Sequence, residues 1–78
     1  MEVMNVEALE YYAGLTVDVA LLQSEYRKGE KKETLEVIVA GLSKLLRLSE
    51  LFFLNGELDY VSLNEINEEY EKYRLLQK

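Results

Sequence analysis

The chain has 78 residues with no cysteine, no histidine and no proline, and its fifteen acidic and nine basic side chains give a net charge of −6. Without cysteine or histidine, the chain cannot form disulfides, thiolate metal sites or a histidine general base. The acidic balance argues against binding to nucleic acid or to an anionic membrane, because affinity for phosphate comes from lysine and arginine.

The first segment with a helical pattern runs over residues 5–28. Apolar residues recur there every three or four positions, as one face of an amphipathic helix requires. That face consists of Met4, Ala8, Tyr11, Leu15, Val19, Leu22 and Tyr26, and a second stripe roughly opposite consists of Val6, Leu9, Ala13, Val17 and Ala20. We expect Asn5 to cap the start of the helix and Gly29 to stand just past its end, where glycine is favoured.

A second helix is predicted over residues 31–54. Its β-branched start, Val37-Ile38-Val39, could open a strand, but the three-and-four spacing continues for about twenty residues and favours a helix. One broad face carries Leu35, Ile38, Val39, Leu42, Leu45, Leu46, Phe52 and Phe53, and Val37, Leu48 and Leu51 widen it. This apolar face covers more of the circumference than a surface helix of a monomer needs.

The dipeptide Asn55-Gly56 has three possible interpretations. It could form a two-residue β-hairpin, it could end one helix before the next, or it could be the middle of a calcium loop. An EF-hand alignment on Gly56 puts Leu51 and Phe53 at ligand positions, and these apolar side chains cannot coordinate a hard cation. Since the helical pattern continues to Leu54, we interpret Gly56 as a left-handed helix cap.

A third, shorter helix is predicted over residues 62–77. Ser62 and Glu65 fit a capping box, in which Ser62 caps the helix and Glu65 reaches back to it. Residues 57–61 are left as a connection that is either extended or coil. The sequence therefore predicts a single all-α domain over residues 1–78, with two long antiparallel helices and a shorter third one.

The surplus of apolar surface on the two long helices predicts that a helical bundle is completed by dimerisation. One stripe of the first helix can pack on the second helix of the same chain, and the other is left for a partner copy. The candidate dimer-interface residues are Leu15, Val19, Leu22, Leu42, Leu45 and Phe52.

The remaining candidate surface is acidic and rich in tyrosine. Tyrosine is common at interface hot spots, and clustered carboxylates suit a basic partner. The candidate partner-binding residues are Glu57, Asp59, Tyr60, Glu65, Glu68, Glu69, Tyr70 and Tyr73. We expect a small acidic protein–protein interaction module that binds stoichiometrically to a protein partner, of a kind common among phage, viral and plasmid accessory proteins. The alternative is an acidic mimic of nucleic acid that inhibits a DNA- or RNA-binding protein.

Enzymatic chemistry is not expected. The sequence contains no phosphate-binding glycine loop and no nucleophile–base pair, and Arg27, Arg47 and Arg74 are its only arginines. We therefore expect no catalytic residues, no cofactor and no metal. The N-terminal stretch lacks a basic region followed by an apolar core, so we expect a cytoplasmic protein without a signal peptide.

Overall fold

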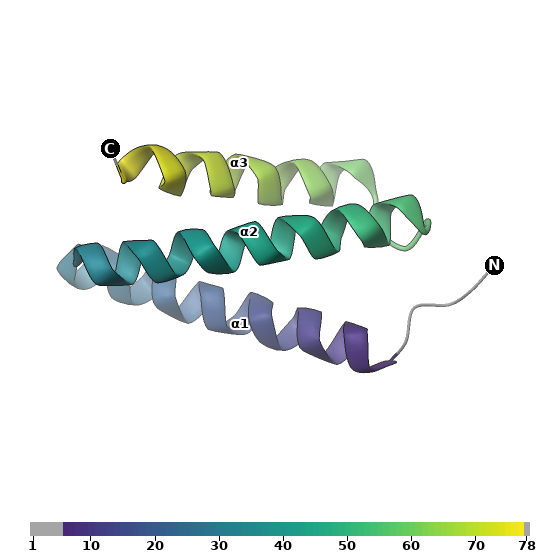
Figure 1. The fold of residues 1–78 in the computed structure, drawn as a ribbon, viewed down its shortest axis with the longest axis horizontal. Helices are drawn as coiled ribbons and strands as arrows, with labels where there is room; N and C mark the ends of the chain where they lie inside the picture. Colours follow the sequence, from purple (N-terminus) through teal and green to yellow (C-terminus); the bar gives the residue numbers. More distant parts are fainter. Residues whose placement is uncertain (1–5, 78) are drawn as a thin grey trace.

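The computed structural model describes residues 6–77, which form three α-helices and no strand. These are α1 (Val6–Gly29), α2 (Lys32–Leu54) and α3 (Tyr60–Leu76). The helices lie side by side with α2 between the other two, in a flat body of 44 × 21 × 15 Å (Figure 1). The predicted all-α fold is confirmed, and the expected roles of Met4 and Asn5 lie outside the described residues.

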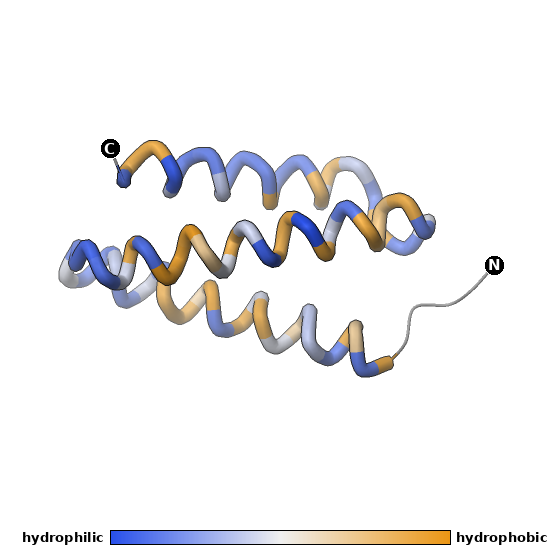
Figure 2. Tube along the Cα trace, viewed as in Figure 1, coloured by the Kyte–Doolittle hydropathy of each residue, from blue (hydrophilic) through white to orange (hydrophobic). Residues whose placement is uncertain are grey.

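The hydrophobic core follows one face of α2. Because α1 and α3 both pack on α2, apolar residues of all three helices meet above this face. The buried cluster consists of Val19, Leu35, Ile38, Leu42, Leu45 and Tyr73. Hydrophilic residues make up most of α3, whereas hydrophobic and hydrophilic residues alternate along α2 (Figure 2). The central helix therefore supplies most of the core.

The face that α1 turns to the core differs from the prediction at one residue. Tyr12 packs against the core, while Tyr11 is 54% exposed. Both tyrosines lie at an allowed spacing from Ala8, so periodicity did not distinguish them. The hydroxyl groups of Tyr12 and of Ser49 on α2 share a 3.0 Å hydrogen bond, and the Tyr12 ring meets Phe52 edge to face at 5.0 Å. Ser49 is fully buried, and this bond satisfies its hydroxyl.

The helices α1 and α2 approach each other closely at Gly41. A methyl group built on Gly41 would lie 2.8 Å from Cγ2 of Val19, which is shorter than a van der Waals contact. Val19 itself is 3% exposed and has a stiff β-branched side chain. The glycine therefore allows the two helices to pack at this point.

The end of α2 agrees with the prediction. The helix ends at Leu54, and Gly56 has a φ of 78°. The Gly56 N–H donates to the Phe53 carbonyl at 3.0 Å, and the Glu57 N–H donates to the Phe52 carbonyl at 2.9 Å. These two bonds define a Schellman cap, which satisfies carbonyls that the helix itself leaves unpaired. Asn55-Gly56 is thus a helix end, and the hairpin is ruled out at this position.

The start of α3 differs from the prediction. The helix begins at Tyr60, so Tyr60 and Val61 are helical and Ser62 is not the cap. Asp59 is the cap instead, since its carboxylate accepts a 2.7 Å hydrogen bond from the Ser62 N–H. That bond, together with one from the Ser62 hydroxyl, holds the pKa of Asp59 below its ordinary value. The serine that resembled a cap is the residue whose amide is being capped.

The turn between α1 and α2 also differs from the prediction. Gly29 is the last residue of α1, and the left-handed conformation falls on Glu30, which has a φ of 50°. The Glu30 N–H donates to the Tyr26 carbonyl at 2.7 Å. Glu30, which has a Cβ, thus adopts the left-handed conformation that glycine adopts at the lowest cost. The glycine itself lies one position earlier, at Gly29.

Candidate functional site

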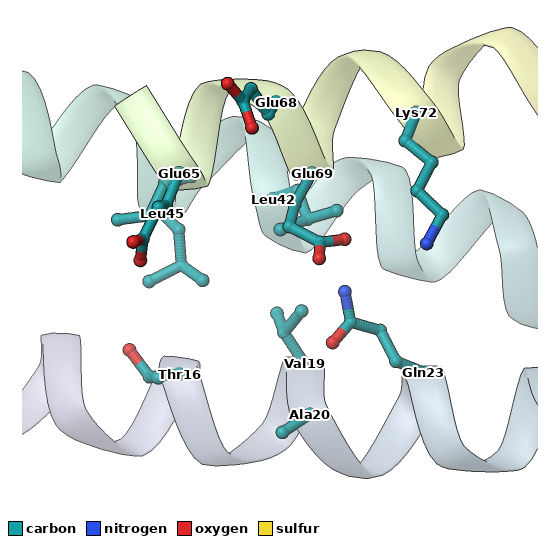
Figure 3. Close-up of a pocket in the computed structure, with 11 residues that line it drawn as sticks. Thr16, Val19, Ala20, Gln23, Leu42, Leu45, Glu65, Glu68, Glu69 and Lys72 are labelled. Atoms are coloured by element: carbon teal, nitrogen blue, oxygen red, sulfur yellow. The ribbon is translucent and has the colours of Figure 1, made fainter. Parts of the chain in front are cut away.

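A groove of about 480 Å³ lies between α1 and α3, with α2 beneath it (Figure 3). Its floor consists of Val19, Leu42, Leu45 and Ile66. Three of these four side chains are buried in the core and Ile66 is half-buried, so the floor is apolar and already well packed. A ligand in the groove would therefore take its specificity from the two sides.

One side of the groove, called the α3 wall here, consists of Glu65, Glu68, Glu69 and Lys72. The carboxylates of Glu65 and Glu69 and the ammonium of Lys72 project from α3 towards α1 (Figure 3). Glu68 instead accepts a 3.0 Å hydrogen bond from the Asn64 side chain. Within residues 6–77, neither Glu65 nor Glu69 takes part in an ion pair. The α3 wall thus carries two exposed carboxylates whose charge is not neutralised by direct contact with a described cation.

The opposite side, called the α1 wall, carries no charge. Thr16, Ala20 and Gln23 line the groove from α1, and the Thr16 hydroxyl donates to the Tyr12 carbonyl of its own helix at 2.8 Å. Residues three and four positions apart share a helix face, and Leu9 and Ala13 continue this face towards the start of α1. The full α1 wall is Leu9, Ala13, Thr16, Ala20 and Gln23.

The α1 wall includes part of the predicted second apolar stripe of α1. Leu9 is 44% exposed, and Ala13 and Ala20 are also exposed. Val6 and Val17, which are 67% and 57% exposed, lie within about 20° of each other around the helix and further from the groove than these three. The surplus apolar surface expected from the sequence is therefore real, and part of it adjoins the groove.

The candidate partner-binding residues are separated into three places. Glu65, Glu68 and Glu69 line the groove, whereas Tyr70 and Tyr73 pack in the core, with the Tyr73 ring 6.1 Å from that of Tyr26. The other three lie at the turn into α3: Glu57 accepts from Asn55 at 3.4 Å, Asp59 caps the helix, and Tyr60 is 65% exposed. Only the three glutamates share one concave surface.

The candidate dimer-interface residues lie inside the protomer. Val19, Leu42, Leu45 and Phe52 are buried, and Leu15 and Leu22 are half-buried against the core. The four buried side chains are covered within the protomer, whereas Leu15 and Leu22 keep part of their surface exposed. A dimer could also use other exposed apolar surface, such as Leu9 on the α1 wall. Dimerisation itself stays a prediction.

A second hollow of about 320 Å³ lies where α2 ends and α3 begins. Leu46, Phe53, Leu54, Tyr60 and Leu63 are its apolar lining. The ring centroids of Phe53 on α2 and Tyr60 on α3 are 6.2 Å apart, and the two rings meet edge to face. This aromatic pair bounds the hollow at the turn between the two helices. Glu50 is the one charged residue in its lining. A ligand would therefore meet fewer charged side chains in this hollow than in the groove.

Sequence reasoning missed several residues of the site. Thr16, Gln23 and Lys72 were not selected, because an uncharged polar residue or a single lysine carries no periodic signal. Glu71 belonged to the same acidic run, but its carboxylate pairs with Arg74 at 2.6 Å and does not line the groove. That contact raises the pKa of Arg74 through the hydrogen bond and the charge of Glu71.

Within residues 6–77, no cluster of three or more potential ligand side chains is arranged to hold a metal ion. None of the helices in this range combines the length and the apolar character that a bilayer crossing requires. The chain matches no known protein-family model, no curated protein and no solved structure.

Proposed function

We propose that the chain is a small acidic protein-interaction module that binds a protein partner stoichiometrically through the groove between α1 and α3. The observation that carries this proposal is a groove in which an uncharged wall faces an acidic wall across an apolar floor. Exposed apolar surface next to polar groups is typical of protein-binding sites. No catalytic role is proposed, since the groove holds carboxylates and one ammonium but no nucleophile–base pair.

The groove favours this function over mimicry of nucleic acid. A mimic needs carboxylates spaced along its surface like phosphates, and its acidic residues would be Glu57, Asp59, Glu65, Glu68, Glu69 and Glu71. In the structure, Asp59 is committed to a helix cap and Glu71 to an ion pair. The glutamates that remain together stand beside apolar side chains, which a mimic does not require.

The proposal can be tested with a matched pair of variants. Ala20→Arg places a long side chain in the groove, whereas Ala40→Arg makes the same change on an exposed position of α2 away from it. We expect the wild type and Ala40→Arg to retain the same protein from a host lysate, and Ala20→Arg to lose it. The retained protein should then bind the purified chain at one-to-one stoichiometry in calorimetry. Equal retention by all three chains would refute binding through the groove.

Self-association is a separate proposal. A second copy could cover the exposed apolar surface of the α1 wall or of the hollow at the end of α2. Sedimentation of the whole chain at micromolar concentration tests this directly. A single folded monomer across that range would refute the homodimer and leave the proposed heterologous binding unaffected.

A further inference from the structure

The two walls of the groove differ in chemistry in a way that specifies an occupant. The α1 wall is uncharged from Leu9 to Gln23, while the α3 wall presents Glu65 and Glu69. We propose that the groove binds a cationic amphipathic helix of a partner protein, with apolar residues against the α1 wall and the floor and with lysine or arginine along the α3 wall. This inference rests on the proposed function and names the chemistry of its partner.

The shape of the groove fits a helix. The lining residues extend from Thr16 to Gln23 on α1 and from Glu65 to Lys72 on α3, which is a rise of about 10.5 Å on each side. The α1 wall continues to Leu9 and so offers an uncharged edge about 21 Å long. An amphipathic helix would occupy the fourth position of a bundle in which α1, α2 and α3 are the other three.

The charges of the groove fit a cation. Glu65 and Glu69 are four residues apart, so their carboxylates stand one turn apart on α3 and face the groove (Figure 3). Basic residues at the same spacing on a partner helix would meet both of them. A neutral or acidic helix would cover the two carboxylates without compensating their lost hydration. The α3 wall therefore selects for lysine or arginine on one edge of the partner.

A second copy of this chain fits the groove less well. The groove of one chain is lined by three glutamates and one lysine. Two grooves placed face to face would bring together twice that number, six carboxylates and two ammonium groups. Like charges brought into contact are destabilising, so charge disfavours this arrangement.

The probe is a synthetic helical peptide of about 18 residues, which is about 27 Å long and spans the whole edge from Leu9 to Gln23. Leucines at helical spacing form its apolar face, and lysines four residues apart form one edge. The control peptide keeps the leucines and carries glutamate in place of each lysine. By calorimetry at physiological ionic strength, we expect the lysine peptide to bind the whole chain at least about tenfold more tightly than the control.

The protein is varied in matched pairs. We expect Glu65→Gln with Glu69→Gln to weaken binding of the lysine peptide by about three- to tenfold. The control, Glu10→Gln with Glu25→Gln, makes the same change in net charge at exposed positions of α1 outside the groove and should leave the affinity unchanged. Circular dichroism confirms that each variant is folded.

Four results would overturn the inference. Equal affinity for the lysine and glutamate peptides would show that the α3 wall does not recognise charge. Equal weakening by the two pairs of Gln variants would show that only net charge matters. Self-association that Ala20→Arg abolishes would show that a second copy occupies the groove. If neither peptide binds while Ala20→Arg still loses the lysate protein, the cationic helix is refuted and the proposed function stands.

Discussion

Substitution of Gly41 by alanine should destabilise the protein, although alanine is the better helix former. In an open helix interior, Gly→Ala stabilises by roughly 0.5–1 kcal/mol. At Gly41 the added methyl would lie 2.8 Å from Cγ2 of Val19. Overpacking of this kind costs about 1–3 kcal/mol, because the stiff valine cannot move aside without leaving its preferred rotamer. The difference between these two effects is a net loss of about 0–2.5 kcal/mol.

Gly14 provides the matched control. It lies within α1, and a methyl group built on it meets nothing within 4 Å. Gly14→Ala should therefore stabilise by roughly 0.5–1 kcal/mol. The two variants should shift the melting temperature in opposite directions, each by several degrees in a domain of this size.

Urea unfolding followed by circular dichroism measures both changes. In a Val19→Ala background the cost of Gly41→Ala should largely disappear, since the opposing methyl is gone. If Gly41→Ala stabilised the chain as much as Gly14→Ala does, the close approach of α1 and α2 described here would be wrong.

Three further changes test other details of the fold. Glu30→Gly should stabilise by about 1 kcal/mol in urea unfolding, because it relieves a non-glycine residue at a φ of 50°; a loss of stability would contradict the left-handed turn. Tyr12→Phe should cost about 1–3 kcal/mol by leaving the buried Ser49 hydroxyl unpaired, and adding Ser49→Ala should recover most of that loss; two independent, additive losses would argue against the bond. Asp59 has a pKa lowered by folding, so its contribution is present at neutral pH and is lost as the pH falls through its folded-state pKa. Asp59→Asn should therefore flatten the acid side of the stability–pH profile, and an unchanged profile would show that the cap does not titrate with folding.

The helices were predictable because periodicity extends over many residues and tolerates single errors. The end of α2 at Leu54 and the left-handed Gly56 were both correct, since the apolar pattern and the glycine agreed. The start of α3 was wrong because Asp59 and Ser62 are both good caps, and only the hydrogen bond between them shows which one acts. Likewise, Gly29 marked the turn but not the residue that takes the positive φ.

The candidate site was predictable only in part. The run from Glu65 to Glu69 could be placed on one helix, but its position beside the α1 wall depends on how α1 and α3 pack around α2. The same packing determined that Tyr73 is buried while Tyr60 is exposed. The width of the apolar faces was visible in the sequence, whereas the side chains that remain exposed became clear only from the assembled helices.

Mapping of the peptide-binding surface by NMR tests the central claim most directly. Nitrogen–proton spectra of the whole chain would be recorded while the lysine peptide is added. We expect the amide shifts to concentrate at Thr16, Ala20 and Gln23 on α1 and at Glu65 and Glu69 on α3. Shifts confined to the outer face of α2, around Lys44 and Arg47, or to the hollow beside Leu54 and Tyr60, would contradict binding in the groove.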